Sequence, residues 1–182
     1  MPVSQITEVF NERLGARYGV RLKGGGAEPF YQAPKAPECA LIVFRADYSA
    51  SALHEVAHWC LAGRQRRLLD DYGYWYLPAR NAAQQAAFEA VEARPQALEA
   101  LFAEAAGVDF QVSSDDVASL PSPAFKARVA AERRLIEQQL PVRARCFLAA
   151  LKGANALIAP TAARTASVTA SGTVSQSVAG SR

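Results

Sequence analysis

A chain of 182 residues with 51% hydrophobic and 20% charged residues has the composition of one globular domain that can bury a core. The net charge of +3 lacks the strongly basic character typical of nucleic-acid-binding proteins, so no direct contact with nucleic acid is expected. No apolar run approaches the roughly 20 residues that a membrane span requires, so no membrane contact is expected either.

Cysteine usage and the N-terminal sequence favour the cytoplasm. The three cysteines, Cys39, Cys60 and Cys146, are odd in number and lack C-x-x-C spacing, which indicates free or buried thiols. The first residues, MPVSQITEVFNERLG, contain no apolar stretch of the kind found in secretory signals. We therefore expect a cytoplasmic protein, and we expect it to be a monomer.

The first part of the chain predicts a helix followed by a strand. Apolar residues recur at helical spacing over residues 3–18, which favours an amphipathic helix. Gly24, Gly25 and Gly26, followed by several prolines, indicate turns and extended chain. The continuous apolar run over residues 40–44 is typical of a buried strand.

A second helix is predicted to begin at Ser49 or Ser51 and to stop at Gly63, because serine favours helix starts and glycine favours helix ends. One side of this helix is apolar, so we expect it to pack on that side and to present its opposite side to a cleft. The apolar side comprises Leu53, Ala57 and Leu61, extended by Trp59 and Cys60.

The two histidines of the chain, His54 and His58, lie four residues apart on this predicted helix, and Glu55 directly follows the first. Together they form the H-E-x-x-H pattern of helical metal sites. Positions i and i+4 share one face of a helix, so both imidazoles can bind a single divalent ion. Glu55 lies beside them, where a carboxylate can move a proton on metal-bound water.

A third helical segment follows, with Asn81 as its expected N-cap and Gly107 at its expected end. Pro95 lies inside this segment. Proline lacks an N–H and its ring clashes with the preceding turn, so we expect it to interrupt or restart the helix. The segment is therefore predicted as two parts, residues 82–93 and 95–106.

The rest of the chain predicts a short strand over residues 110–112, a charged helix over 124–139 and a short helix over 142–152. From position 160 onward the chain is rich in Ala, Ser, Thr and Val and lacks aromatic and acidic residues. Such a segment cannot bury enough surface to offset the entropy of ordering, so residues 160–182 are predicted to be a disordered tail. Residues 1–159 form the predicted domain.

Two histidines alone hold a metal poorly, so a third protein ligand is expected. The chain has no further histidine and its cysteines are not well placed, which leaves Asp or Glu. Glu89 and Glu92 are the local candidates, because they lie on the next helix among apolar residues, where an unpaired carboxylate is costly.

Two histidines and one carboxylate suit more than one kind of metal site. With zinc they form a peptidase site, in which Glu55 acts as the base toward a bound water. With iron(II) they leave coordination positions open for dioxygen. The spacing does not choose between these chemistries, and a purely structural metal is a further alternative.

Two clusters beside the motif are candidates for substrate contacts, although the first is also typical of a solvated face and the second of a core. The basic cluster comprises Arg64, Arg66 and Arg67, and the aromatic cluster comprises Tyr72, Tyr74, Trp75 and Tyr76. The arginines can meet an acidic partner surface, and the aromatic rings can line a cleft.

Long stretches around the motif resemble the bacterial elongation factor P hydroxylase family. They are SALHEVAHWCLAG at 51–63, RRLLDDYGYWY at 66–76, FEAVEARPQAL at 88–98 and AAG at 105–107. The similarity covers roughly residues 3–152. It implies hydroxylation of the β-lysylated lysine of elongation factor P, the translation factor that relieves stalling at proline runs.

The resemblance also implies a set of site residues. The family's metal ligands fall on His54, His58 and Glu92, with Glu89 as the alternative to Glu92. The implied enzyme is a non-haem oxygenase that uses a divalent metal, expected to be Fe(II), and dioxygen. Glu55 is then expected to tune the site or to move protons.

The family's fold implies a helix-rich α+β single domain with a small sheet. Its helical metal site is metallopeptidase-like (zincin-like), and it is not the jelly roll of common iron oxygenases. Contacts with the modified side chain are expected from Arg66, Arg67, Tyr74 and Trp75. The alternatives are a zinc peptidase of the H-E-x-x-H type and a protein with a structural metal only.

Overall fold

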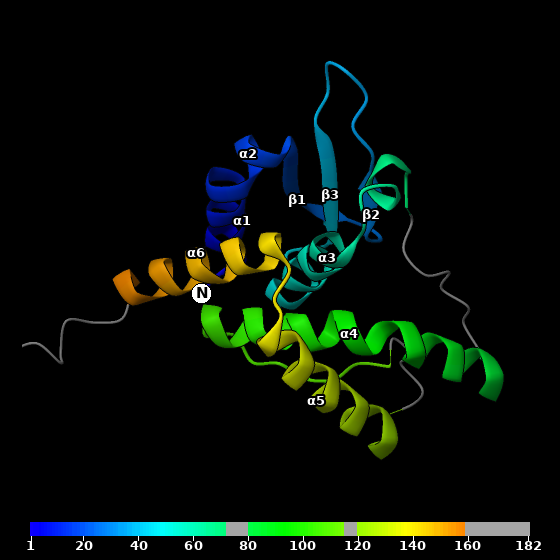
Figure 1. The fold of residues 1–182 in the computed structure, drawn as a ribbon. Coiled ribbons are helices and arrows are strands. Elements are labelled where there is room, and N and C mark those ends of the chain that lie inside the picture. The colour runs from blue at the N-terminus through cyan, green and yellow to red at the C-terminus, as the bar shows by residue number, and fades with distance from the viewer. Residues whose placement is uncertain (72–79, 115–119, 159–182) are drawn as a thin grey trace, which may run out of the picture.

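The computed structural model describes residues 1–71, 80–114 and 120–158 as a set of helices around a small sheet (Figure 1). Among these residues the fold is a helix-rich α+β domain with three strands and no jelly roll, as predicted. The predicted tail over residues 160–182 lies outside the described residues, so it stays a prediction.

The N-terminal helix predicted over residues 3–18 is confirmed. It consists of α1 (Val3–Phe10), a π-helical stretch (Asn11–Gly15) and α2 (Ala16–Tyr18), and it ends where Gly19 adopts a left-handed conformation with φ of 61°. Its apolar stripe is fully buried and comprises Ile6, Phe10 and Leu14.

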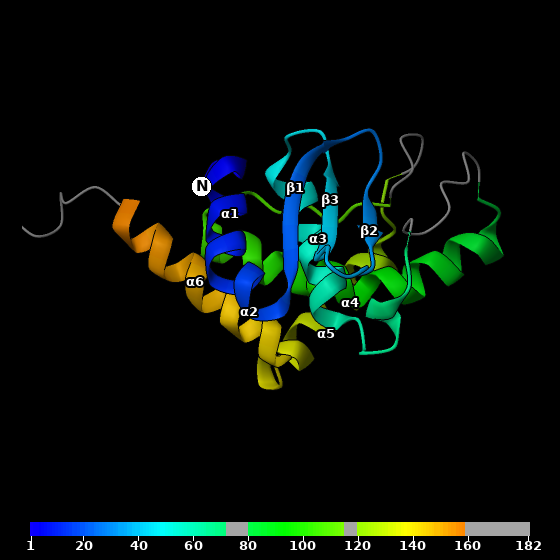
Figure 2. The same cartoon turned by 90° about the horizontal axis from the view of Figure 1, so that it is seen from above.

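The sheet has the order β1-β3-β2, formed by β1 (Val20–Gly26), β2 (Phe30–Gln32) and β3 (Ala40–Arg45). The central strand β3 runs parallel to β1 and antiparallel to β2. Figure 2 shows the three strands side by side, with α1 next to β1. The predicted strand over 40–44 is therefore confirmed as the centre of the sheet, and its inward residues Ala40, Ile42 and Phe44 are buried.

The three glycines, which were predicted with the following prolines to mark turns and extended chain, form the end of the extended strand β1. A Cβ atom on Gly24 would lie 2.6 Å from a ring carbon of Phe44, and one on Gly26 would lie 2.6 Å from Cγ1 of Val43. Gly25 has a φ of 89°, which other residues rarely adopt. Close packing of β1 on β3 thus requires Gly24 and Gly26, and the backbone conformation favours glycine at position 25. A strand of this kind lacks the apolar pattern that would predict it.

The motif helix α3 (Ser49–Leu61) begins at the predicted residue but without a serine cap. Its N-cap is Tyr48, and the Ser51 hydroxyl accepts a hydrogen bond of 3.0 Å from the backbone N–H of Arg45. That bond fastens the start of α3 to the end of β3. α3 packs against both β3 and α4 (Ala82–Ala106) and lies between the sheet and α4 in Figure 1.

The C-terminus of α3 is stabilised by an arginine, and Gly63 does not adopt the left-handed conformation of a glycine cap. The guanidinium of Arg143 donates to the carbonyls of Trp59, Cys60 and Ala62 at 3.2, 3.0 and 2.7 Å. These are carbonyls that a helix end leaves without intrahelical partners, and a cation there also favours the helix dipole. An arginine distant in sequence therefore stabilises the helix end, where the local pattern predicted a glycine.

The third helical segment is one continuous helix, so the predicted interruption at Pro95 is wrong. Asn81 caps it as expected, through a reciprocal pair of 2.9 Å hydrogen bonds with Gln84, and Gly107 ends it with a φ of 65°. An internal proline costs about 3 kcal/mol in an isolated helix. Here the helix continues because the turns after Glu92 are buried against α3, α5 and α6.

The remaining predictions need two corrections. Residues 110–112 form no strand; the neighbouring Ser113 has its backbone N–H and carbonyl bound by the side chain of Gln96 at 3.0 and 2.8 Å. The last helix, α6 (Val142–Ile158), extends beyond the predicted 142–152, because its later turns pack near the end of α4, where Asn155 lies beside Gly107. The helix predicted over 124–139 is confirmed as α5 (Pro123–Gln138).

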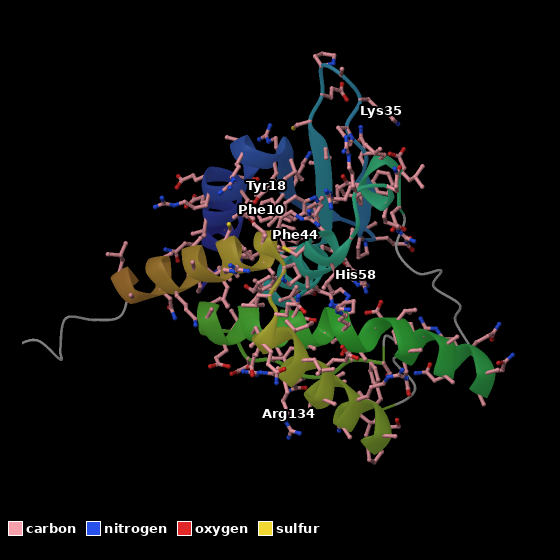
Figure 3. The ribbon with its side chains drawn as sticks, viewed as in Figure 1. Phe10, Tyr18, Lys35, Phe44, His58 and Arg134 are labelled. Carbon is pink, nitrogen blue, oxygen red and sulfur yellow. The ribbon has the colours of Figure 1, made fainter. Side chains whose placement is uncertain are left out.

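Four aromatic rings join the helices at the centre of the core, and Figure 3 labels one of them, Phe10. The ring of Phe10 contacts Trp59 and Phe147, each at a centroid distance of 5.5 Å, and Phe102 contacts Phe147 at 5.0 Å. These edge-to-face pairs tie α1, α3, α4 and α6 together.

The three cysteines are free, as predicted. Among the residues described, no helix has the length and apolarity needed to cross a membrane.

Candidate metal centre

Three predicted ligands meet where α4 crosses α3. The Nε2 atoms of His54 and His58 lie 2.9 Å apart, and each is 3.4 Å from one carboxylate oxygen of Glu92. Figure 3 shows His58 between the two helices. The helical i, i+4 spacing places the histidines together, and the packing of α4 on α3 brings in the carboxylate.

The separations of these atoms suit a common ion. Ligand atoms about 2.1 Å from one ion lie about 3.0 Å apart at a right angle and about 3.4 Å apart at the tetrahedral angle. The three ligand atoms lie within 4.8 Å of one another. Two imidazole nitrogens and a carboxylate oxygen suit zinc or iron. The residues present therefore fit a divalent metal.

Glu92 has the environment expected of a metal ligand. It is only 2% exposed, and its Oε2 forms no hydrogen bond within the described residues. Burial alone would raise the pKa of this carboxyl, but the neighbouring His58, His54 and Arg80 lower it below its ordinary value. A buried carboxylate oxygen without a hydrogen-bond partner is costly unless a cation compensates it.

Glu89, the alternative ligand, lies elsewhere. It is half-buried one turn before Glu92, and it accepts a hydrogen bond of 3.2 Å from the side chain of Gln85. It is not part of the group that can hold an ion. The structure thus brings Glu92 to the histidines and leaves Glu89 outside.

A fourth residue, Glu99, contacts the site and was missed from the sequence. Its Oε2 lies 2.8 Å from Nδ1 of His54, on the side of the ring opposite to the ligand nitrogen. Glu99 follows Glu92 by seven residues, which is two helical turns and hence the same face of α4. That spacing was a usable signal once the helix was known to continue through Pro95.

The charges around His54 act strongly on its protonation. Burial alone would lower the pKa of His54, but the carboxylates of Glu99, Glu92 and Glu55 outweigh that effect and raise the pKa to about 10. With this pKa, the imidazole of His54 is protonated and positively charged at neutral pH. A bound metal would replace that proton, since a histidine ligand must offer a neutral nitrogen.

The ligands lie in the wall of a cavity of about 960 Å³. Glu55, the predicted catalytic carboxylate, lines this cavity beside His54 and His58. Polar side chains from other elements complete the wall, including Arg80 before α4 and Gln111 after it. The cavity is large enough for a long side chain to reach the metal ligands.

The predicted substrate residues are only partly described. Arg66 and Arg67 line the cavity, and each also has an internal partner. Arg66 donates to Asp71 at 3.0 Å, and Arg67 donates to the carbonyl of Ala62. Their contact with a substrate stays a prediction. Tyr74 and Trp75 lie outside the described residues, as do the other members of the aromatic cluster.

The fold and site define a class of protein: a helix-rich domain in which an H-E-x-x-H helix and a glutamate from a second helix form a group that can hold a metal ion, at the wall of a cavity. Within that class, residues 9–162 match the elongation factor P hydroxylase family. The curated Elongation factor P lysine hydroxylase of Haemophilus influenzae is 41% identical over 155 residues, covering 82% of this chain and 86% of that protein. The chain therefore belongs to the elongation factor P hydroxylase family.

Proposed function

We propose that this protein hydroxylates the β-lysylated lysine of elongation factor P. The observation that carries the proposal is the family match, which spans residues 9–162 and so includes all of His54, His58 and Glu92. The relative from Haemophilus influenzae carries the name of the same activity and is similar over most of both chains. The partner is then a protein whose modified side chain enters the cavity.

The metal is proposed to be iron(II), because the target is an unactivated C–H bond. A side-chain base cannot remove a hydrogen from such a bond, whereas iron(II) supplies the chemistry that activates dioxygen for this attack. One oxygen atom enters the C–H bond, and the other leaves as water after an external reductant provides two electrons. The enzyme is thus an oxidoreductase of the monooxygenase type.

The chain's own residues would hold that ion. The Nε2 atoms of His54 and His58 and the carboxylate of Glu92 would be its protein ligands, and all three residues line the cavity. Glu55 is placed in the wall to hold or move a proton beside the ligands. Arg66 and Arg67, at the same cavity, are proposed to meet acidic groups of the protein substrate.

A single reaction tests this proposal. The purified protein is loaded with iron(II) without oxygen and mixed with β-lysylated elongation factor P, ascorbate and then air. Mass spectrometry should show a gain of about 16 Da on the modified lysine, and no gain without air or metal. Cleavage of a peptide bond by the zinc-loaded protein, with no oxygen addition by the iron-loaded form, would favour a zinc peptidase instead.

A further inference from the structure

We propose that Glu99 is a positioning residue that fixes the ring of His54 for metal binding. The inference rests on the proposed metal site and adds a role for a carboxylate that is not itself a ligand. Glu99 is 7% exposed, and its Oε2 lies 2.8 Å from Nδ1 of His54. It lies on α4, and His54 lies on α3, so the contact also joins the two helices that build the site.

The chemistry of the two partners determines which nitrogen faces the metal. An ionised carboxylate can only accept hydrogen bonds, so Nδ1 of His54 must carry the hydrogen in this contact. A neutral imidazole has one N–H, which leaves the lone pair on Nε2. That atom is the one that lies 2.9 Å from Nε2 of His58 and 3.4 Å from Glu92. Glu99 thus selects the tautomer that the proposed site requires.

The same helix supplies the ligand and its support. Glu92 and Glu99 are seven residues apart on one face of α4, and the helix is continuous between them. The carboxylates therefore reach opposite nitrogens of one imidazole from a rigid element, and the ring of His54 is held from both sides.

Two substitutions separate the charge of Glu99 from its hydrogen bond. Glu99→Gln removes the charge but retains an oxygen that accepts from Nδ1–H, whereas Glu99→Leu removes both. Glu104→Gln is the matched control, because Glu104 lies on the same helix in an exposed ion pair with Arg133. Zinc, which is diamagnetic and suits the same ligands, serves as the probe in a competition titration against a chelator.

Loss of the hydrogen bond should weaken zinc binding most. We expect Glu99→Leu to bind zinc about 10- to 100-fold more weakly, Glu99→Gln to lose less, and Glu104→Gln to bind as the parent does. Melting temperatures of the metal-free forms show whether each variant folds. If Glu99→Leu does not fold, the zinc affinity of Glu99→Gln, which conserves the shape of the side chain, is compared with that of the parent. Equal zinc affinity in the parent and in both Glu99 variants would overturn the proposal.

Nitrogen NMR of the histidine rings gives a reading that a general loss of stability would not produce. In the zinc-bound parent, His54 should carry its hydrogen on Nδ1 and bind through Nε2. Binding through Nδ1 would overturn the role of Glu99 while leaving the metal site intact. A parent protein that binds no zinc or iron at all would instead contradict the proposed function.

Discussion

The two halves of α4 form one continuous helix but differ in how deeply they are buried. Before Glu92 the helix is mostly exposed, and Figure 1 shows that end extending past the other elements. From Glu92 to Ala106 nearly every residue is buried. Two glutamates only three residues apart, Glu89 and Glu92, therefore have different environments. Helical spacing could not distinguish them, because the distinction comes from which turns α3 covers.

The buried half of α4 carries polar side chains that lie at the candidate site. Its interior-facing polar side chains are Glu92, Gln96 and Glu99. Glu92 faces both histidines, Glu99 contacts His54, and Gln96 binds the backbone of Ser113 at the cavity wall. Buried polar groups are costly unless they have partners, so these three residues are the candidates on α4 for roles at the site.

The largest effect is expected from substitutions of the α3 residues that face the buried half of α4. His54→Ala and His58→Ala should each lose bound metal and at least about 100-fold of hydroxylation activity, because two ligands hold an ion poorly. Glu55→Gln should retain the metal and lose turnover, since Glu55 lines the cavity without being part of the ligand group. Elemental analysis alongside the mass-spectrometric assay checks both, and metal loss in Glu55→Gln would show that the ligand set is wrong.

The carboxylates of the buried half should also make metal affinity depend on pH. The pKa of His54 in the metal-free protein is about 10, so at neutral pH a metal must displace its proton. Raising the pH removes this competitor, and zinc affinity should rise about tenfold per pH unit between about pH 6 and 8. Chelator competition at several pH values measures the slope. An affinity independent of pH would contradict the strong electrostatic hold of Glu99 and Glu92 on His54.

A moderate effect is expected at the C-terminus of the motif helix. Arg143→Met removes the donor to three carbonyls of α3, and we expect the free energy of unfolding to fall by about 2 kcal/mol. Arg145→Met is the control, because Arg145 is exposed and makes one 3.2 Å bond to the carbonyl of Leu140. Urea denaturation of both compares the sites. Equal stability losses would mean that Arg143 does not hold the end of α3.

The smallest effect is expected from the C-terminal segment. Truncation after residue 159 should leave the melting temperature and the hydroxylation activity unchanged. Residues 160–182 are rich in Ala, Ser, Thr and Val, and this composition does not support a packed core. Calorimetry and the oxygen-addition assay of the shortened chain test this expectation. A drop of several degrees would show that the segment packs on the domain.

Local patterns predicted the elements whose signals lie within a few residues. The helix over 3–18, the central strand and the caps at Asn81 and Gly107 follow from spacing and from cap chemistry. Three features depended on distant neighbours instead. β1 contains Gly24 and Gly26 because β3 approaches closely. The C-terminus of α3 is stabilised by Arg143, and α4 continues through Pro95 because its later turns are buried.

The site divides in the same way. The positions of His54 and His58 on one helix face follow from the i, i+4 pattern alone. The distinction between Glu92 and Glu89 required the family resemblance, and the contact of Glu99 with His54 required the crossing of α3 and α4. Sequence spacing fixes residues within one helix, whereas the packing of two helices decides which of their residues meet.

The most direct test compares bound metal in Glu92→Ala and Glu89→Ala, two changes of the same chemistry on the two halves of α4. Each variant is loaded with iron(II) without oxygen, desalted and analysed for metal per chain. Glu89→Ala should retain about one iron, as the parent does, and Glu92→Ala should retain almost none. Full occupancy in Glu92→Ala with loss in Glu89→Ala would contradict the assignment of the ligand to the buried half.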